Sequence, residues 1–398
     1  EKFFAPIRDV VSMVKLKASY GLVGNDQIGG DRRFIYNETV IGGGKYYFGT
    51  TPSQYTSVRL GEFPNPNVGW EKAKKFNLGA DLSFFNQLNI SVDYFKENRE
   101  GIFLQRKSIP MYVGLSTKPW VNIGKMRNSG IDASLEYHQP LGKDLHLTVR
   151  GNFTYARNRI MDQDEPDYAY TYMNHSGQMQ WQKFGLVAAG LFQDQEDIDS
   201  WAKQSFGEVK PGDIKYLDLN GDGIVDNYDT KPIGYSDIPE IVYGFGFSLQ
   251  WKAFDLSAFF QGVAHVSFST LTDQTQAFVG RNLKESSVFA DLYGNTWTPE
   301  NPGAKYPRMT TGAIDNNNQL STFWMANGRY LRLKNLELGY TLPKRIANKI
   351  AMQSLRVYLS GVNLFTFSPF KLWDPDLQTG ATNYPNNRII NLGLTIGF

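Results

Sequence analysis

The stretch Arg388-Ile-Ile-Asn-Leu-Gly-Leu-Thr-Ile-Gly-Phe398 decides the fold. Apolar side chains occupy every second position, and small or polar residues lie between them. The apolar series is Ile390, Leu392, Leu394, Ile396 and Phe398. Because side chains of a β-strand alternate between its two faces, this stretch predicts a strand with one apolar and one small, polar face. Alternation by itself fits a half-buried strand of a soluble sheet as well as a strand that faces lipid.

The same alternation recurs along the chain. With the closing stretch we count about ten strands, an even number as bacterial barrels have. The other apolar series lie within residues 14–22, 76–84, 88–94, 131–137, 145–155, 243–251, 254–260, 323–342 and 355–359. The phase of the longest series slips near Asn335 and Leu336, which predicts a β-bulge.

The connections between these strands alternate between short and long. The short ones are 86–87, 140–144, 252–253 and 343–353, the last with a predicted small helix that has Pro343 in its first turn. The long ones are 23–70, 99–129, 158–240, 264–322 and 366–387. Soluble domains rarely contain many long irregular loops, whereas outer-membrane barrels have short periplasmic turns and long extracellular loops. The alternation therefore predicts an all-β fold, a transmembrane antiparallel β-barrel whose long loops lie outside the cell.

The polar strand faces agree with this prediction. They carry Lys15, Lys17, Asp81, Asp93, Asp132, Glu136, Arg150 and Asn152. In a membrane barrel these side chains would line a hydrated lumen and the apolar ones would meet the lipid bilayer. A soluble barrel or sandwich would turn the apolar face inward, and the sequence leaves that alternative open.

Composition narrows the functional classes. Charged residues make up 20% of the chain and the net charge is +2, so we expect no nucleic-acid partner. The absence of cysteine excludes disulfides, zinc–thiolate sites and cysteine nucleophiles within these residues. The chain begins at Glu1 with neither an initiator Met nor a secretion signal, and we therefore expect a piece of a longer protein.

Residues 218–229, inside the long connection 158–240, have the spacing of a calcium-binding loop. The side-chain ligands would be Asp218, Asn220, Asp222, Asp226 and Asp229, with Ile224 offering its backbone carbonyl. Several converging oxygens suit a hard cation, so the loop predicts a structural calcium or magnesium ion that orders this connection. The last ligand is Asp rather than Glu, which resembles dockerin-type loops. The alternative is an acidic turn stabilised by side-chain to backbone hydrogen bonds.

The sequence offers no evident catalytic constellation, and we predict that the chain is not an enzyme. The histidines are scattered, at His138, His146, His175 and His265, without a metal-ligand spacing. An outer-membrane protease or hydrolase remains the enzymatic alternative, and its candidate groups are His175 and His265 with Asp164, Asp167 or Asp273.

Aromatic residues in the long connections are the candidate substrate contacts, because flat exposed rings stack on sugars and on peptide side chains. The candidates are Tyr46, Tyr47, Tyr168, Tyr170, Tyr172 and Trp181. The same rings would equally serve to pack the loops against one another.

Four stretches, taken with the closing strand, carry a family resemblance. They are Lys15-Leu-Lys-Ala-Ser-Tyr-Gly21 with Gly24-Asn25, Asn65-Pro-Asn-Val-Gly-Trp70-Glu71, residues 212–262 with the calcium-type loop, and Tyr330-Leu-Arg-Leu-Lys-Asn-Leu-Glu-Leu-Gly-Tyr340. Together they resemble the C-terminal half of the SusC/RagA family of TonB-linked outer-membrane transporters of Bacteroidetes. The final aromatic, Phe398, and Ile396 resemble the terminal signal read by the barrel-insertion machinery.

The resemblance implies a barrel of about twenty-two strands, of which residues 1–398 would supply about ten. It places a plug domain and a TonB-contacting box N-terminal to this chain. It also implies a SusD-like surface lipoprotein partner and TonB-energised import of oligosaccharides or oligopeptides, and it admits a dimer of transporter–lipoprotein pairs. A passive porin-like channel is the non-energised alternative.

Overall fold

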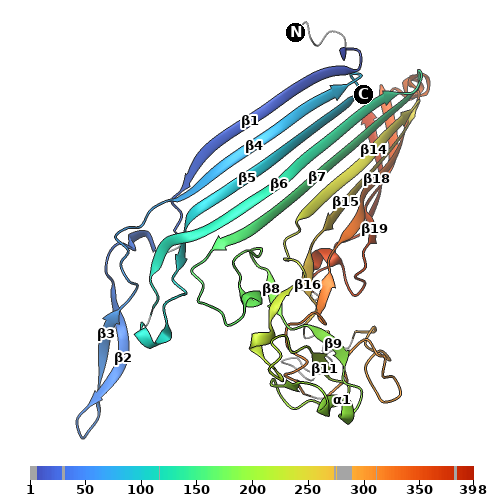
Figure 1. Ribbon diagram of the computed structural model, residues 1–398. Helices are drawn as coiled ribbons and strands as arrows, with labels where there is room; N and C mark the ends of the chain where they lie inside the picture. The colour runs from blue at the N-terminus through green and yellow to red at the C-terminus, as the bar shows by residue number, and fades with distance from the viewer. Residues whose placement is uncertain are drawn as a thin grey trace.

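The computed structural model (Figure 1) describes residues 7–28, 32–115, 117–272, 275, 289–310, 312–380 and 383–398. Its main element is a 10-stranded sheet in the order β1-β4-β5-β6-β7-β14-β15-β18-β19-β20, with every neighbouring pair antiparallel. The strands are β1 (Val11–Asn25), β4 (Glu71–Phe84), β5 (Leu88–Gln105), β6 (Trp120–Pro140), β7 (Leu145–Asp162), β14 (Ile241–Trp251), β15 (Phe254–Ala264), β18 (Tyr330–Thr341), β19 (Ser354–Phe367) and β20 (Ile389–Gly397). The predicted all-β fold and its strand count are confirmed.

Several strands run further than the alternation predicted. β5 has 18 residues and β6 has 21, whereas about 9–11 residues suffice to cross a bilayer. The predicted loop 99–129 is therefore wrong, because only residues 106–119 separate the two strands. Beyond the bilayer both faces of a strand meet water, so a period of two is no longer required of the sequence.

The predicted strand 323–342, by contrast, is too long. β18 begins only at Tyr330, and the preceding β17 (Met325–Asn327) pairs with β16 (Ser267–Ser269) outside the main sheet. The predicted bulge is confirmed, because the register of β18 against both neighbours shifts between Leu333 and Asn335.

The two faces of the sheet differ as the alternation predicted. Apolar side chains on one face stay open to the surroundings, and Leu16 is 77% and Leu394 63% exposed. The other face carries ion pairs between strands, such as Lys17 with Asp81 at 2.7 Å. Within the described residues no second layer covers the apolar face, as a soluble sandwich would require.

The hydrophobic core lies outside the sheet, in a unit that we call the loop module. It is formed by the described parts of the connections 163–240 and 265–329, and Figure 1 shows it beyond the end of the sheet that is opposite the two termini. Its buried residues are Leu191, Ile214, Tyr216, Val225, Leu186, Leu292, Trp297, Tyr306 and Trp324. The sequence predicted irregular loops here, but both connections fold together around one core.

Short elements shape the loop module. They are β8 (Lys183–Gly185), β9 (Ala188–Leu191), α1 (Gln195–Asp199), β10 (Lys203–Gln204), β11 (Ile214–Tyr216), β12 (Ile224–Val225), β13 (Lys231–Ile233), β16 and β17. The described part of the module also contains two short 3₁₀ helices, Thr171–Met173 and Asn227–Asp229. Other 3₁₀ helices, outside the module, span Arg32–Phe34, Met111–Val113, Asn348–Ile350 and Pro375–Leu377. The predicted helix after Pro343 is present as α2 (Lys344–Ala347), with Pro343 at its N-cap. No helix in the described ranges is long and apolar enough to cross a membrane.

A separate hairpin consists of β2 (Val40–Phe48) and β3 (Ser53–Leu60), and Figure 1 shows it projecting away from the loop module. At the other extreme of the chain, Phe398 is 81% and Ile396 43% exposed. Their proposed role as an assembly signal stays a prediction.

Candidate functional site: the loop module and its junctions

A buried carboxylate joins the two connections that build the loop module. Asp213 has no exposed surface, and its Oδ2 accepts a hydrogen bond from Arg308 Nη2 at 3.0 Å. Its Oδ1 accepts from Asn317 Nδ2 at 2.9 Å, and the Asn317 side-chain oxygen accepts from Ile214 N at 2.8 Å. Residues about a hundred positions apart are thus held by charge-assisted bonds in a protected place, where such bonds are strongest.

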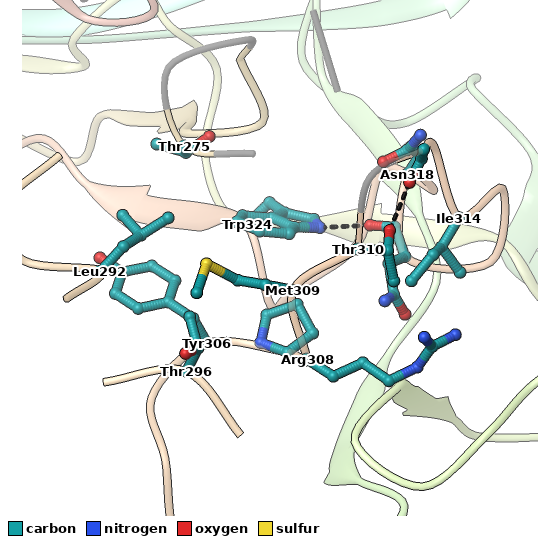
Figure 2. Close-up of a pocket in the computed structure, with 13 residues that line it drawn as sticks. Thr275, Leu292, Thr296, Tyr306, Arg308, Met309, Thr310, Ile314, Asn318 and Trp324 are labelled. Carbon is teal, nitrogen blue, oxygen red and sulfur yellow. Dashed lines mark hydrogen bonds between the residues drawn. The ribbon is translucent and has the colours of Figure 1, made fainter. Parts of the chain in front are cut away.

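Figure 2 shows the pocket beside this anchor, with Leu292, Tyr306, Met309 and Trp324 among its walls. The Trp324 ring is fixed by a hydrogen bond from its Nε1 to the Asn317 carbonyl, at 2.8 Å. The cavity volume is about 40 Å³, room for a few water molecules and far below that of ordinary ligand pockets. This pocket is a packing feature of the module and not a substrate site.

The calcium-type loop forms a tight turn closed by its own side chains. Asp218 accepts hydrogen bonds from the N–H groups of Gly221 at 2.6 Å and Gly223 at 2.8 Å. Asp229, which is fully buried, accepts from Leu219 N at 2.6 Å and from Asp226 N at 2.8 Å. These are the bonds of the acidic-turn alternative.

The remaining predicted ligands behave alike. The Asn220 side chain accepts a hydrogen bond from Asp222 N, and the Asp222 side chain accepts one from Ile224 N. The Asp226 side chain accepts one from Tyr228 N. In the part of the chain that the structure describes, no three His, Cys, Asp or Glu side chains are grouped closely enough to hold a metal ion. Since each carboxylate oxygen has more than one lone pair, these hydrogen bonds leave acceptor capacity, and an ion at 218–229 stays a prediction.

The structure does not bring the six candidate aromatic residues together. Tyr46 and Tyr47 lie on the β2–β3 hairpin and are 64% and 59% exposed, whereas the other four lie in the connection 163–240 (Figure 1). Tyr170 and Tyr172 stack on each other with ring centroids 5.3 Å apart. Tyr172 also donates a hydrogen bond to the carbonyl of Tyr228 at 2.7 Å. These two rings therefore pack a loop against the calcium-type turn.

The other two candidates differ in their surroundings. Tyr168 contacts His175, with 3.2 Å between the hydroxyl oxygen and Nδ1. Trp181 is 57% exposed and has a left-handed backbone conformation, with φ of 60°. Trp181, Tyr46 and Tyr47 are thus the candidates whose rings are open to a ligand.

The two histidines of the enzymatic alternative lie beside glutamates. His175 Nδ1 is 3.4 Å from Glu165, and burial lowers the pKa of this imidazole. His265 Nδ1 is 3.1 Å from Glu240. Asp164 instead accepts hydrogen bonds from the loop at residues 106–108, and Asp273 lies outside the described residues.

The sequence reasoning missed the junction at which the loop module leaves the sheet. Glu240, which is 4% exposed, accepts a hydrogen bond from Arg157 Nη2 at 2.7 Å and lies beside His265. The His265 ring stacks on Tyr235 with centroids 4.7 Å apart. β14 begins and β15 ends next to this cluster, and Arg157 reaches it from within β7. The spacing of these residues in the sequence gives no recognisable signal.

A second missed group surrounds Arg332, which is 1% exposed on β18. Its guanidinium donates to Asp374 and Asp376 in the connection to β20, the latter at 3.2 Å. The Tyr330 hydroxyl donates to the same Asp376 at 3.0 Å. A single charge within the stretch Leu331-Arg-Leu333 was the available signal, since a charged side chain in an apolar run needs a partner.

Comparisons with known proteins agree with this architecture. A family model described as TonB dependent receptor-like, beta-barrel, matches residues 35–364. The chain is similar to TonB-dependent receptor P3 of Formosa agariphila, with 29% identity over 98% of this chain and 40% of the relative. It is also similar to TonB-dependent receptor SusC of Bacteroides thetaiotaomicron, with 26% identity over 100% of this chain and 39% of the relative.

Among solved structures, the RagAB peptide importer in its open-open state superposes with a TM-score of 0.73 and 22% identity, over 98% of this chain and 40% of that chain. The chain therefore spans about 40% of the length of the curated relatives that it matches.

Proposed function

Since the chain belongs to the TonB-dependent receptor-like β-barrel family and is part of a bacterial outer-membrane protein of the SusC/RagA type, we propose that it supplies part of the barrel of an active nutrient importer. The family predicted from the sequence is confirmed. The cargo would be oligosaccharides or oligopeptides, and import would be energised through TonB. The plug and the TonB-contacting box would belong to the longer protein.

The observation that carries this proposal is the sheet itself. Its apolar face is open and its polar face is bridged by ion pairs, as hydrocarbon outside and water inside require. In the described chain, β1 pairs only with β4, and β20 only with β19. A bilayer does not tolerate such unpaired edges, so further strands must close the barrel and widen its lumen.

A SusD-like lipoprotein is the partner we propose for the loop side. The loop module has its own core and lies beyond the ends of the strands. It therefore presents a folded surface that the lipoprotein or the cargo could contact. The β2–β3 hairpin adds open aromatic rings, with Tyr46, Phe48 and Tyr55 between 56% and 64% exposed. A similar protein of known structure is described as a peptide importer, which supports cargo of oligomer size. The importer–lipoprotein pairs would associate as a dimer.

Uptake in cells tests the proposal. Cells that carry the full-length protein should accumulate labelled oligosaccharide or oligopeptide, and removal of TonB should abolish accumulation while leaving the protein in the membrane. Accumulation that continues at the same rate without TonB would identify the passive porin-like channel instead. Hydrolysis of the cargo by the purified protein would favour the enzymatic alternative.

A further inference from the structure

A polar pocket lies beside Arg332, where the connection 368–388 folds back against β18 and β19. We call it the Arg332 pocket, and its volume is about 430 Å³. The residues that matter below are Arg332, Thr366, Lys371, Asp374, Asn386 and Arg388. Arg332 and Thr366 are paired in register with Gln261, on the sheet face that also carries Asp255. The pocket therefore opens on the polar side of the sheet, which the proposed function makes the lumen.

The acidic side chains at this pocket, Asp374 in its wall and the neighbouring Asp376, already accept hydrogen bonds. Asp374 and Asp376 both accept hydrogen bonds from the buried Arg332. Asn386 Nδ2 donates to each of the two carboxylates at 3.2 Å, and Thr366 accepts from Arg332 Nε at 3.0 Å. These bonds fix the positions of the two carboxylates, and Arg332 offsets the charge of one of them.

The other two cations of the pocket are not engaged in this way. Lys371 and Arg388 are exposed, and within the described ranges neither has a carboxylate within ion-pair distance. Arg388 instead lies over the Phe365 ring, with its guanidinium carbon 5.8 Å from the centroid. Counting the neighbouring Asp376, three cations thus stand against two carboxylates at the pocket, and Lys371 and Arg388 approach it from opposite ends of one connection.

An anionic group is the ligand that this arrangement suits. Arg offers a planar fork that matches a carboxylate, and Lys adds a mobile point charge beside it. Phe370 and Trp373 form part of the wall, with ring centroids 4.6 Å apart, and give an apolar surface for the carbon skeleton that bears the charge.

We propose that the Arg332 pocket is a lumen subsite for a carboxylate group of the cargo, bound by Lys371 and Arg388 on a wall fixed by Arg332. This proposal rests on the proposed function, because it names the chemistry of the cargo. The carboxylate would come from the uronic acid of an oligosaccharide or from the C-terminus of an oligopeptide, and binding measurements distinguish these two sources.

The test uses the full-length protein purified from the outer membrane and isothermal titration with two probe pairs. One pair is trigalacturonate and its methyl ester, and the other is trialanine and its C-terminal amide. The wild type should bind the charged member of one pair about tenfold more tightly, as a charge-assisted bond at a partly exposed site would give. The double variant Lys371→Gln/Arg388→Gln should lose that preference. Lys203→Gln is the matched control and should keep the preference, because the Lys203 side chain is exposed and has no ion-pair partner among the described residues.

Two results would overturn the subsite. One is equal affinity for the charged and uncharged members in both pairs, and the other is an unchanged preference in the double variant. Raising the salt concentration should weaken the binding of the charged probe and leave the binding of the uncharged probe unchanged. TonB-dependent uptake of a neutral oligomer by a protein without charge preference would leave the proposed function standing and remove the subsite alone.

Discussion

Replacing Asp213 by Ala should make the loop module open more often while the barrel strands stay intact. The substitution leaves Arg308 and Asn317 without their shared acceptor inside the module. Removing one partner of a buried ion pair costs roughly 3–5 kcal/mol, and because the Arg308 side chain is 22% exposed we expect about 2–4 kcal/mol here. A loss of about 3 kcal/mol raises the opening constant roughly a hundredfold.

Hydrogen exchange on the full-length protein in detergent measures this opening. Amides near Ile214 and Trp324 should lose protection in Asp213→Ala, and amides of β18 and β19 should keep it. Glu208→Gln is the matched control, because Glu208 pairs with Lys210 at 3.8 Å but its side chain is 82% exposed, and such pairs contribute about 1 kcal/mol or less. Protection in the module that is the same in Asp213→Ala and in the wild type would refute the anchor.

Three further predictions concern the same module. Chelating divalent ions should make the full-length protein more sensitive to proteases within 218–229, and equal cleavage with and without the chelator would leave only the acidic turn. Burial lowers the folded-state pKa of His175, so its contribution to the stability of the module should be complete above about pH 6.5 and should fall as the pH drops below it. The hydrogen-exchange protection of the amides of residues 168–178 should therefore be lower at pH 5 than at pH 7.5. The variant His175→Gln should remove this difference. Gly212 has φ of 89°, and a Cβ there would lie 2.4 Å from the Trp297 ring. Gly212→Ala should therefore destabilise the module by about 1–3 kcal/mol, which thermal unfolding measures. Gly221→Ala is the control and should destabilise it less, because a Cβ at Gly221 would meet open space.

The strands could be predicted because one face of each strand meets lipid and the other face meets water. Residues such as Leu392 and Asn391 alternate along β20 since neighbouring side chains meet opposite environments. The alternation disappears where both faces of a strand meet water, so the sequence predicts a loop at the ends of β5 and β6 although the strands continue there.

The loop module could not be predicted from local pattern. Its strands are two to four residues long, too short to show a period, and its core joins Ile214 to residues beyond position 290. The six candidate aromatic residues lie in connections, as predicted, yet folding divides them between the hairpin and the module. Arg332 lies within the stretch 330–340 that carries part of the family resemblance, but its partners, Asp374 and Asp376, come from the connection between β19 and β20.

Spin-label accessibility on β19 tests the central claim most directly. The 398 residues contain no cysteine. In the full-length protein, with any cysteine elsewhere replaced, a single Leu359→Cys or Ser360→Cys places one label on either face of this strand. Leu359 pairs with Leu338 and Leu392 on the apolar face, and Ser360 pairs with Glu337 on the polar face. In a bilayer, the label at 359 should collide with lipid-soluble oxygen and not with a water-soluble nickel chelate, and the label at 360 should show the reverse. A label at 359 that is reached by the chelate and not by oxygen would contradict a barrel wall with hydrocarbon on its apolar side.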